Sequence, residues 1–314
     1  MKVALWHVHG SWTTSLVSGG DEYLLVTRPG GGPWGRGRAG RNWPATREVN
    51  LTELAAAAPD VVVLQRPEEI GLIEQALGRR VGADVPAVYV EHNAPRPYAA
   101  ESTHPLAGRT DIPLVHVTAF NRMMWDNGRC PTVVIDHGIV DPGPRYRGDL
   151  ARAGTLINEP VRRARVTGTD LLPDIAGAAP VDVWGIGTDE LRIHPQVHGC
   201  GDLPQDALFD ALVRRRVFVH TARWTSLGLS LLEAMHLGMP IVAVAATEAA
   251  TAIPAEAGVV STDPAVLTTA VREFVSDPVR AELAGKAARE AALARFGLHR
   301  FRTAWHNLLT EVTR

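Results

Sequence analysis

Residues 217–243 read VFVHTARWTSLGLSLLEAMHLGMPIVA, and this stretch decides the fold of the chain around it. The apolar runs 217–219 and 241–244 predict two buried strands. Between them, small and polar residues lead into a helix that begins near Leu229 and ends at Gly238, a typical helix-ending residue. Strand, turn, helix and strand in this order predict a βαβ unit. Its turn lies at the carboxyl end of a strand, where open α/β sheets bind their ligands.

The turn before this helix has the chemistry of a site for a nucleoside diphosphate. Gly228 has no Cβ, so backbone can approach a ligand closely there. The first N–H groups of the helix have no intrahelical partner and carry the positive end of the helix dipole, which favours phosphate. Glu233 follows one turn later, and its carboxylate can accept two hydrogen bonds from a ribose diol. The alternative is an ordinary surface glutamate on an amphipathic helix.

Residues 228–243, GLSLLEAMHLGMPIVA, resemble the donor-site signature of retaining GT-B glycosyltransferases of the group 1 type, glycosyltransferase family 4. The resemblance implies that the donor is bound by the turn and the helix. The residues concerned are Thr225, Ser226, Leu227, Gly228, Leu229 and Glu233. The sequence departs from the pattern at Thr225, where the family has a glutamate that contacts the donor sugar, and at Ser226, where a glycine is usual. The nucleotide end of the site is therefore intact, and the departure affects its sugar end.

Length and composition exclude several classes of protein. The 314 residues suffice for two domains, and 46% hydrophobic with 21% charged residues is ordinary for a globular chain. A formal net charge of −2 gives no case for nucleic acid as a partner. Two cysteines make no disulfide framework and have no metal-ligand spacing. The apolar start, residues 3–8, is too short and too polar for a signal peptide, so we expect a cytoplasmic protein. Peripheral contact with a membrane and the oligomeric state stay open.

The chain as a whole predicts an α/β protein of two domains. The resemblance implies a GT-B fold, in which two Rossmann-like domains face a central cleft. We expect an N-terminal acceptor domain over 1–141, a C-terminal nucleotide-sugar domain over 142–297, and a helix over 298–314 that crosses back to the N-terminal domain. Further strands are expected over 3–9, 23–28, 60–64, 87–91, 114–118, 132–135, 155–157, 181–186 and 258–260. Helices are expected over 68–81, from residue 121, and over 170–175, 264–275, 278–294 and 298–312.

Two features of the N-terminal half bear on a ligand. Gly10 follows the first strand, and the resemblance implies that donor phosphates approach the loop there; a plain β-turn explains the glycine equally well. The segment 29–41 is rich in glycine and arginine and predicts a mobile loop, in which solvated charges are favoured over a site for an anionic acceptor or lipid headgroup.

His92 follows the strand over 87–91, in a loop at its carboxyl end. The resemblance implies that it reaches the donor sugar from the N-terminal domain, and the alternative is a hydrogen-bonded structural imidazole. Further on, Asp136, His137 and Gly138 occupy the place of the family's Pro-Asn-Gly, near the end of this domain.

A basic segment opens the second domain, with Arg162, Arg163 and Arg165. Guanidinium groups suit phosphate oxygens. The resemblance places an arginine and, five residues later, a lysine on the donor diphosphate; Asn158 and Arg163 stand at those positions here. The alternative is that these arginines form an ordinary basic segment before the next helix. Gly199 lies in the segment that corresponds to the family's nucleobase loop.

The resemblance therefore implies transfer of a sugar from a nucleoside diphosphate sugar to a hydroxyl, with retention of configuration. His92, Arg163 and Glu233 are the expected catalytic residues. No metal site and no cofactor beyond the donor substrate are expected, because no DxD-like pair is present. The acceptor is a small molecule, a glycan or a lipid. A non-catalytic nucleotide-sugar binder and a GT-B-fold sugar-nucleotide isomerase remain as alternatives.

Overall fold

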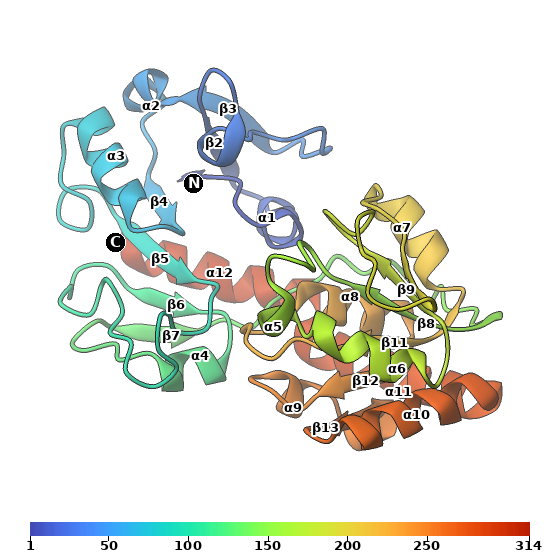
Figure 1. The fold of residues 1–314 in the computed structure, drawn as a ribbon. Coiled ribbons are helices and arrows are strands. Elements are labelled where there is room, and N and C mark those ends of the chain that lie inside the picture. The colour runs from blue at the N-terminus through green and yellow to red at the C-terminus, as the bar shows by residue number, and fades with distance from the viewer. The chain divides into compact units, whose positions relative to one another are not determined.

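A computed structural model describes residues 1–314, and the chain in it divides into two compact units (Figure 1). Unit 1 comprises Met1–Val140 together with Leu298–Arg314, and unit 2 comprises Asp141–Gly297. Each unit contains one parallel sheet with helices on both faces, the arrangement of a Rossmann-like domain.

Unit 1 contains a seven-stranded sheet in the order β3-β2-β1-β4-β5-β6-β7, with every pair parallel. Its strands are β1 (Lys2–Leu5), β2 (Glu22–Thr27), β3 (Thr46–Asn50), β4 (Val61–Leu64), β5 (Ala87–Glu91), β6 (Leu114–His116) and β7 (Thr132–Val134). Its helices are α1 (Gly10–Val17), η1 (Gly32–Trp34), α2 (Leu51–Ala57), α3 (Glu68–Leu77), α4 (Ala119–Met124) and α12 (Leu298–Val312). The strand order reverses between β1 and β4, which makes their carboxyl ends the switch point of the sheet.

Burial explains why short apolar runs form these strands. All four residues of β4, VVVL, are buried, because helices cover both faces of the sheet. On one face, Leu54 of α2 and Ile73 of α3 pack into a core with strand residues. On the other face, α1 contacts α12, and α12 contacts β5.

Unit 2 contains a six-stranded parallel sheet in the order β10-β9-β8-β11-β12-β13. Its strands are β8 (Leu150–Leu156), β9 (Val181–Trp184), β10 (Val197–Gly199), β11 (Arg215–His220), β12 (Ile241–Val244) and β13 (Gly258–Ser261). Its helices are α5 (Ala164–Thr167), η2 (Thr169–Leu171), α6 (Leu172–Ala176), α7 (Gln205–Leu212), α8 (Leu229–Leu237), α9 (Ala249–Ala252), η3 (Ala255–Ala257), α10 (Pro264–Ser276) and α11 (Pro278–Phe296). Here the order reverses between β8 and β11.

Several predicted elements are confirmed, and others are wrong in their bounds. The predicted helix over 298–312 is α12, and the helix from Leu229 ends at Gly238, which has a left-handed φ of 85°. The helix expected over 170–175 begins only at Leu172, because Pro173 fits the first turn of a helix. The first strand ends at Leu5, and a helix, not a turn, begins at Gly10. Strand β8 begins at Leu150, five residues before the predicted start.

Candidate functional site

The switch point of unit 2 brings together the segment after β8 and the segment after β11. Backbone N–H groups of Arg223 and Trp224 donate to the carbonyl of Val166 at 2.9 and 3.4 Å. The hydroxyl of Thr221 donates to the carbonyl of Thr167 at 2.7 Å. These bonds fix the predicted phosphate loop, 221–228, against the basic segment that ends in α5. The two halves of the predicted donor site are therefore neighbours in this unit.

Gly228 is the N-cap residue of α8, and no side chain caps this helix. A Cβ at Gly228 would lie 2.6 Å from Cε1 of His220, the last residue of β11. Glycine is therefore required for the loop to pass over the imidazole. His220 is buried, and burial lowers its pKa to about 4, so it is neutral at neutral pH. The free N–H groups at the start of α8 and the neutral ring of His220 therefore lie together at the carboxyl edge of the sheet.

Glu233 lies one turn into α8 and is 7% exposed, so it is not an ordinary surface glutamate. The side-chain amide of Gln205, the first residue of α7, donates to Glu233 Oε1 at 3.1 Å. A buried carboxylate is stable only with partners such as Gln205. Its position at the edge of the sheet also lets a ligand with hydroxyl donors reach it.

The three arginines after β8 differ in their surroundings. Arg162 is exposed and pairs with Glu159, and Arg165 is exposed and pairs with Asp170 at 2.6 Å. Asp170 also accepts from Arg223 at 2.5 Å. Arg163 is half-buried and precedes α5 directly as its N-cap residue.

Asn158 does not act as a cation at the family's arginine position. Its Oδ1 accepts from the backbone N–H of Ile186 at 3.0 Å, so it joins the ends of β8 and β9.

Gly199 ends β10 and lies against a second loop of the same edge. A Cβ there would collide with the carbonyl of Thr188. The hydroxyl of Thr188 accepts from the backbone of Gly201 at 3.0 Å, and Gly185 donates to the carbonyl of Gly201 at 2.9 Å. The segment expected to hold a nucleobase is thus a loop that is held mainly through its backbone and that leads into α7.

The remaining predicted donor residues lie between β11 and α8. Thr225 is half-buried, Ser226 and Leu227 are buried, and Leu229 begins α8. The carbonyl of Ser226 accepts from the backbone of Glu248 at 3.4 Å, which joins this loop to the segment after β12.

In unit 1, Gly10 begins α1, and residues 6–9 separate it from the end of the switch-point strand β1. Its missing Cβ leaves room for the guanidinium of Arg41, which also lies 5.8 Å from the ring centre of Trp43. Arg41 forms no ion pair with a carboxylate. A cation beside the positive end of a helix is unfavourable unless an anion joins them.

His92 is buried, and its Nε2 lies 3.0 Å from Oε1 of Gln65. The amide nitrogen of Gln65 donates to the carbonyl of Trp6 at 2.8 Å, so the Gln65 oxygen accepts and His92 Nε2 is the donor. The ring of His9 lies 4.3 Å from that of His92, and Trp12 lies 4.9 Å from it. Burial lowers the pKa of His92 well below its usual value and that of His9 to about 4. Both rings are neutral at neutral pH.

The Asp136–His137–Gly138 segment is held by α12. Nη2 of Arg300 donates to the carbonyls of Asp136 and His137 at 2.9 Å each. Gly138 packs against Phe301, and burial lowers the pKa of His137 to about 3. Helix α12 therefore positions this loop.

Sequence reasoning missed four polar residues of these edges: His9, Gln65, Gln205 and His220. His9 and His220 follow or end a strand, as His92 does, and the same rule would have found them. The two glutamines are visible only through their partners, His92 and Glu233. No group of three or more His, Cys, Asp or Glu side chains is arranged to hold a metal ion. No helix is long and apolar enough to cross a membrane.

Comparisons with solved structures identify the fold. HepE from Anabaena, solved in complex with UDP-glucose, is similar with a TM-score of 0.75 at 15% identity, over 99% of this chain and 100% of that one. Sucrose-phosphate synthase from Thermosynechococcus elongatus gives 0.73 at 15% identity over 99% of both chains. A glycosyltransferase from Rickettsia africae gives 0.70 at 10% identity over 100% and 98%. The fold is the GT-B fold, as the α8 motif predicted.

The sequence itself matches a family model over part of unit 2. Residues 188–291 match the model of glycosyl transferases group 1. This range contains Gly199, the loop after β11 and the whole of α8, which are most of the predicted donor residues. A search of curated proteins finds no match.

Proposed function

We propose that this chain is a glycosyltransferase that moves a sugar from a nucleoside diphosphate sugar to a hydroxyl acceptor. The observation that carries the proposal is the edge at the β8–β11 switch point. This edge contains the uncapped start of α8, the half-buried Arg163 and the buried Glu233. The family model covers α8 and Glu233, and Arg163 precedes the matched residues. Anabaena HepE binds UDP-glucose, so a uridine nucleotide is the first donor to test.

Each residue has a chemical task in this proposal. The N–H groups of α8 and the guanidinium of Arg163 bind the diphosphate and stabilise the charge that grows on it as the sugar leaves. Glu233 accepts hydrogen bonds from the ribose hydroxyls, and the loop at Gly199 holds the base through its backbone. For His92 we retain the role implied by the resemblance, a hydrogen bond to the transferred sugar. A neutral ring whose Nε2–H is directed to Gln65 has Nδ1 as its acceptor atom.

Retention of configuration and independence from metal ions are parts of the same proposal. Arginines and backbone amides can bind and stabilise a diphosphate without a metal ion. The anomeric configuration of the product, read by NMR, tests the first point. Turnover that disappears with EDTA and returns with Mg²⁺ or Mn²⁺ would contradict the second.

The central test is a calorimetric titration of UDP and of uridine into wild-type protein, Arg163→Ala and Arg162→Ala. Arg163→Ala should weaken UDP binding about 10- to 100-fold, the range for charge-assisted hydrogen bonds, and leave uridine binding unchanged. Arg162→Ala is the matched control, because Arg162 is exposed and pairs with Glu159. Equal effects of the two variants, or equal loss of both ligands, would contradict the assignment.

Incubation with radiolabelled sugar nucleotides then separates the reaction classes. Transfer or slow hydrolysis supports a transferase. Thr225, in place of the family's first glutamate, favours a non-catalytic binder as the second candidate, for which tight binding without turnover is expected. An altered sugar on the nucleotide would indicate an isomerase.

A further inference from the structure

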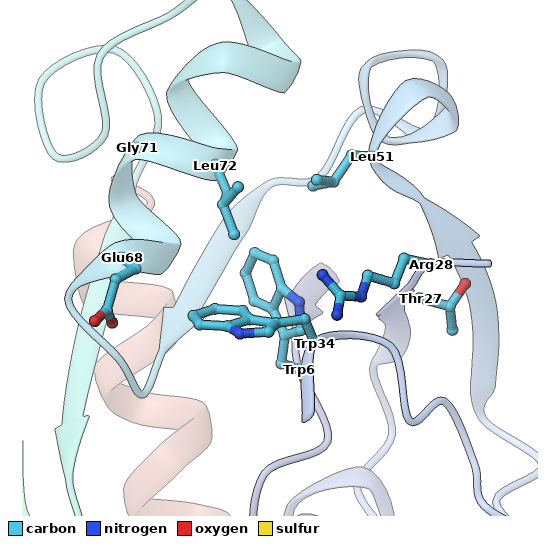
Figure 2. Close-up of a pocket in the computed structure, with 8 residues that line it drawn as sticks. All are labelled: Trp6, Thr27, Arg28, Trp34, Leu51, Glu68, Gly71 and Leu72. Carbon is cyan, nitrogen blue, oxygen red and sulfur yellow. The ribbon is translucent and has the colours of Figure 1, made fainter. Parts of the chain in front are cut away.

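Unit 1 contains a cavity of about 500 Å³ at the carboxyl ends of β1 and β2, between these strand ends, the start of α2 and the first turns of α3 (Figure 2). Its size lies within the range of small-molecule sites. It is lined by Trp6, Thr27, Arg28, Trp34, Leu51, Glu68, Gly71 and Leu72. None of these residues has a task in the proposed donor chemistry, so the cavity needs an explanation of its own.

Two indole rings form the aromatic side of the cavity, and both are held in place. Trp6 is buried, and its carbonyl accepts from the amide of Gln65 at 2.8 Å. The guanidinium carbon of Arg66 lies 3.6 Å from the ring centre of Trp34. Arg66 is itself anchored by Glu69 at 2.7 Å, and by the carbonyl of the residue before Trp34 at 2.8 Å. A rigid aromatic surface of this kind is suited to a flat ring.

The opposite side is aliphatic and has room for a ligand. Leu72 points from α3 toward the indole rings, and Leu51 approaches from the other side (Figure 2). Gly71 lies in the same turn of α3, and a Cβ added there would meet nothing within 4 Å. Gly71 lines the cavity and is exposed, so no side chain at this position fills the space beside it.

One charge points into this apolar space. The guanidinium of Arg28 is directed toward the indole rings (Figure 2), and its one hydrogen bond runs from Nε to the carbonyl of Gly31 at 3.4 Å. Arg28 forms no ion pair with a carboxylate. Glu68 lies across the cavity, with its carboxylate turned away from Arg28. The charge that faces a ligand is therefore positive.

We propose that this cavity binds a flat aromatic group that carries an anionic substituent, and that such a hydroxylated aromatic acid is the sugar acceptor. The second part rests on the proposed function. The indoles and leucines enclose the ring, and Arg28 pairs with the acid group. A bare sugar fits less well, because its many hydroxyls would find few polar partners among these side chains.

The first experiment measures binding of 6-hydroxy-2-naphthoate and of its neutral analogue, 2-naphthol, by calorimetry. Arg28→Gln should weaken binding of the naphthoate about tenfold or more and leave binding of 2-naphthol unchanged, because only the acid pairs with the guanidinium. Weakening of both ligands to the same extent would contradict the role of Arg28, and absence of naphthoate binding to wild-type protein would overturn the proposal.

The second experiment locates the ligand. Gly71→Phe adds a large ring at a residue that lines the cavity and should abolish binding of both naphthalenes, whereas Gly71→Ala adds only a methyl group to open space and should retain it. Circular dichroism and thermal midpoints verify that both variants fold. Naphthoate binding that survives Gly71→Phe would place the ligand elsewhere and overturn the proposal.

A third measurement separates this proposal from the proposed function. Wild-type protein is titrated with UDP and incubated with UDP-glucose and 6-hydroxy-2-naphthoate, with the glucoside followed by mass spectrometry. Glucoside formation that Gly71→Phe abolishes supports the acceptor role. Naphthoate binding with UDP-glucose hydrolysis but no glucoside would contradict that role alone. Failure to bind any nucleotide would contradict the proposed function, whatever the naphthoate titration shows.

Discussion

Glu233 combines two properties that an exposed helical glutamate lacks: it is buried, and it accepts a hydrogen bond from Gln205. A carboxylate that is buried without hydrogen-bond donors raises the free energy of the folded chain, so this position is stable only when donors surround the carboxylate. Gln205 supplies one of them. In our proposal the ribose hydroxyls add two more hydrogen-bond donors when the sugar nucleotide is bound.

A thermodynamic cycle of two proteins and two ligands tests this role. The affinities of wild-type protein and Glu233→Ala for UDP and for 2′,3′-dideoxy-UDP are measured by calorimetry. Wild-type protein should bind UDP about 10- to 100-fold more tightly than the dideoxy ligand, and the variant should bind both equally. Glu282→Ala, on the exposed side of α11, is the control and should keep the wild-type discrimination. Equal discrimination by wild type and Glu233→Ala would place the ribose elsewhere.

Residue types alone do not distinguish Arg162, Arg163 and Arg165, and only the spacing implied by the family resemblance selects Arg163. Their difference depends on Glu159 and Asp170, whose side chains reach two of them only in the folded loop. Hydrogen-bond partners from distant segments, such as Gln65 for His92, depend on the fold in the same way and have no local signal.

At the scale of elements, a close contact fixes α12 against the rest of unit 1. Gly138 lies directly against the side chain of Phe301, where a Cβ cannot fit without movement. Phe301 and Trp305 in turn surround Trp12 of α1, with ring centres 6.4 and 5.6 Å away. One glycine therefore sets the distance between the end of unit 1 and its last helix.

Gly138→Ala should destabilise the protein by about 1–3 kcal/mol, the usual cost of overpacking a core. The matched control is Gly108→Ala, because a Cβ at Gly108 meets nothing within 4 Å and its backbone is not left-handed. The control should stay within about 0.5 kcal/mol of wild type. Urea unfolding followed by circular dichroism measures both. Equal midpoints for the two variants would refute the packing argument.

Long periodic or apolar elements were predicted well, and short polar ones were missed. Helices α10, α11 and α12 match their predicted positions to within two residues, because α10 and α12 are amphipathic and α11 is a long alanine-rich run. Strand β3, TREVN, has two exposed residues and lies at the edge of its sheet, so it lacks an apolar run. Strand β10 is three residues long and also an edge strand. Both segments are strands because they pair with a neighbouring strand, and a short stretch of sequence does not show that pairing.

At the scale of the whole molecule, buried histidines are a common feature of both units. Burial lowers the pKa of seven of them below the usual 6.5. They are His7, His9, His92, His116, His137, His220 and His236. Each is neutral in the folded chain and gains a proton near pH 6.5 when the chain unfolds. The unfolded state therefore binds more protons, and stability falls as the pH falls from about 6.5 toward 4.

We expect the free energy of unfolding, and with it the urea midpoint, to decrease steeply between about pH 7 and pH 4.5. The free energy decreases by up to about 1.4 kcal/mol per pH unit for each such histidine. Glu69, whose pKa burial raises above 4.5, acts in the opposite direction but is a single group. Asp111, Asp170 and Asp182 have pKa values below 3.8, so their effect begins at lower pH. A midpoint that stays constant down to about pH 4.5 would contradict the prediction.

The return of α12 to unit 1 also affects how the chain is made. Residues 141–297 form one uninterrupted stretch, so unit 2 has all of its elements as soon as that stretch has left the ribosome. The main part of unit 1, residues 1–140, is made before this stretch, but the helix that covers Trp12 and packs against Gly138 is made only after it. Unit 1 can therefore be completed only after all of unit 2 has been made, whereas domains of a continuous chain are completed in N-to-C order. The apolar face around Trp12 therefore lacks its covering helix while unit 2 is being made, and a chaperone can bind it during that interval.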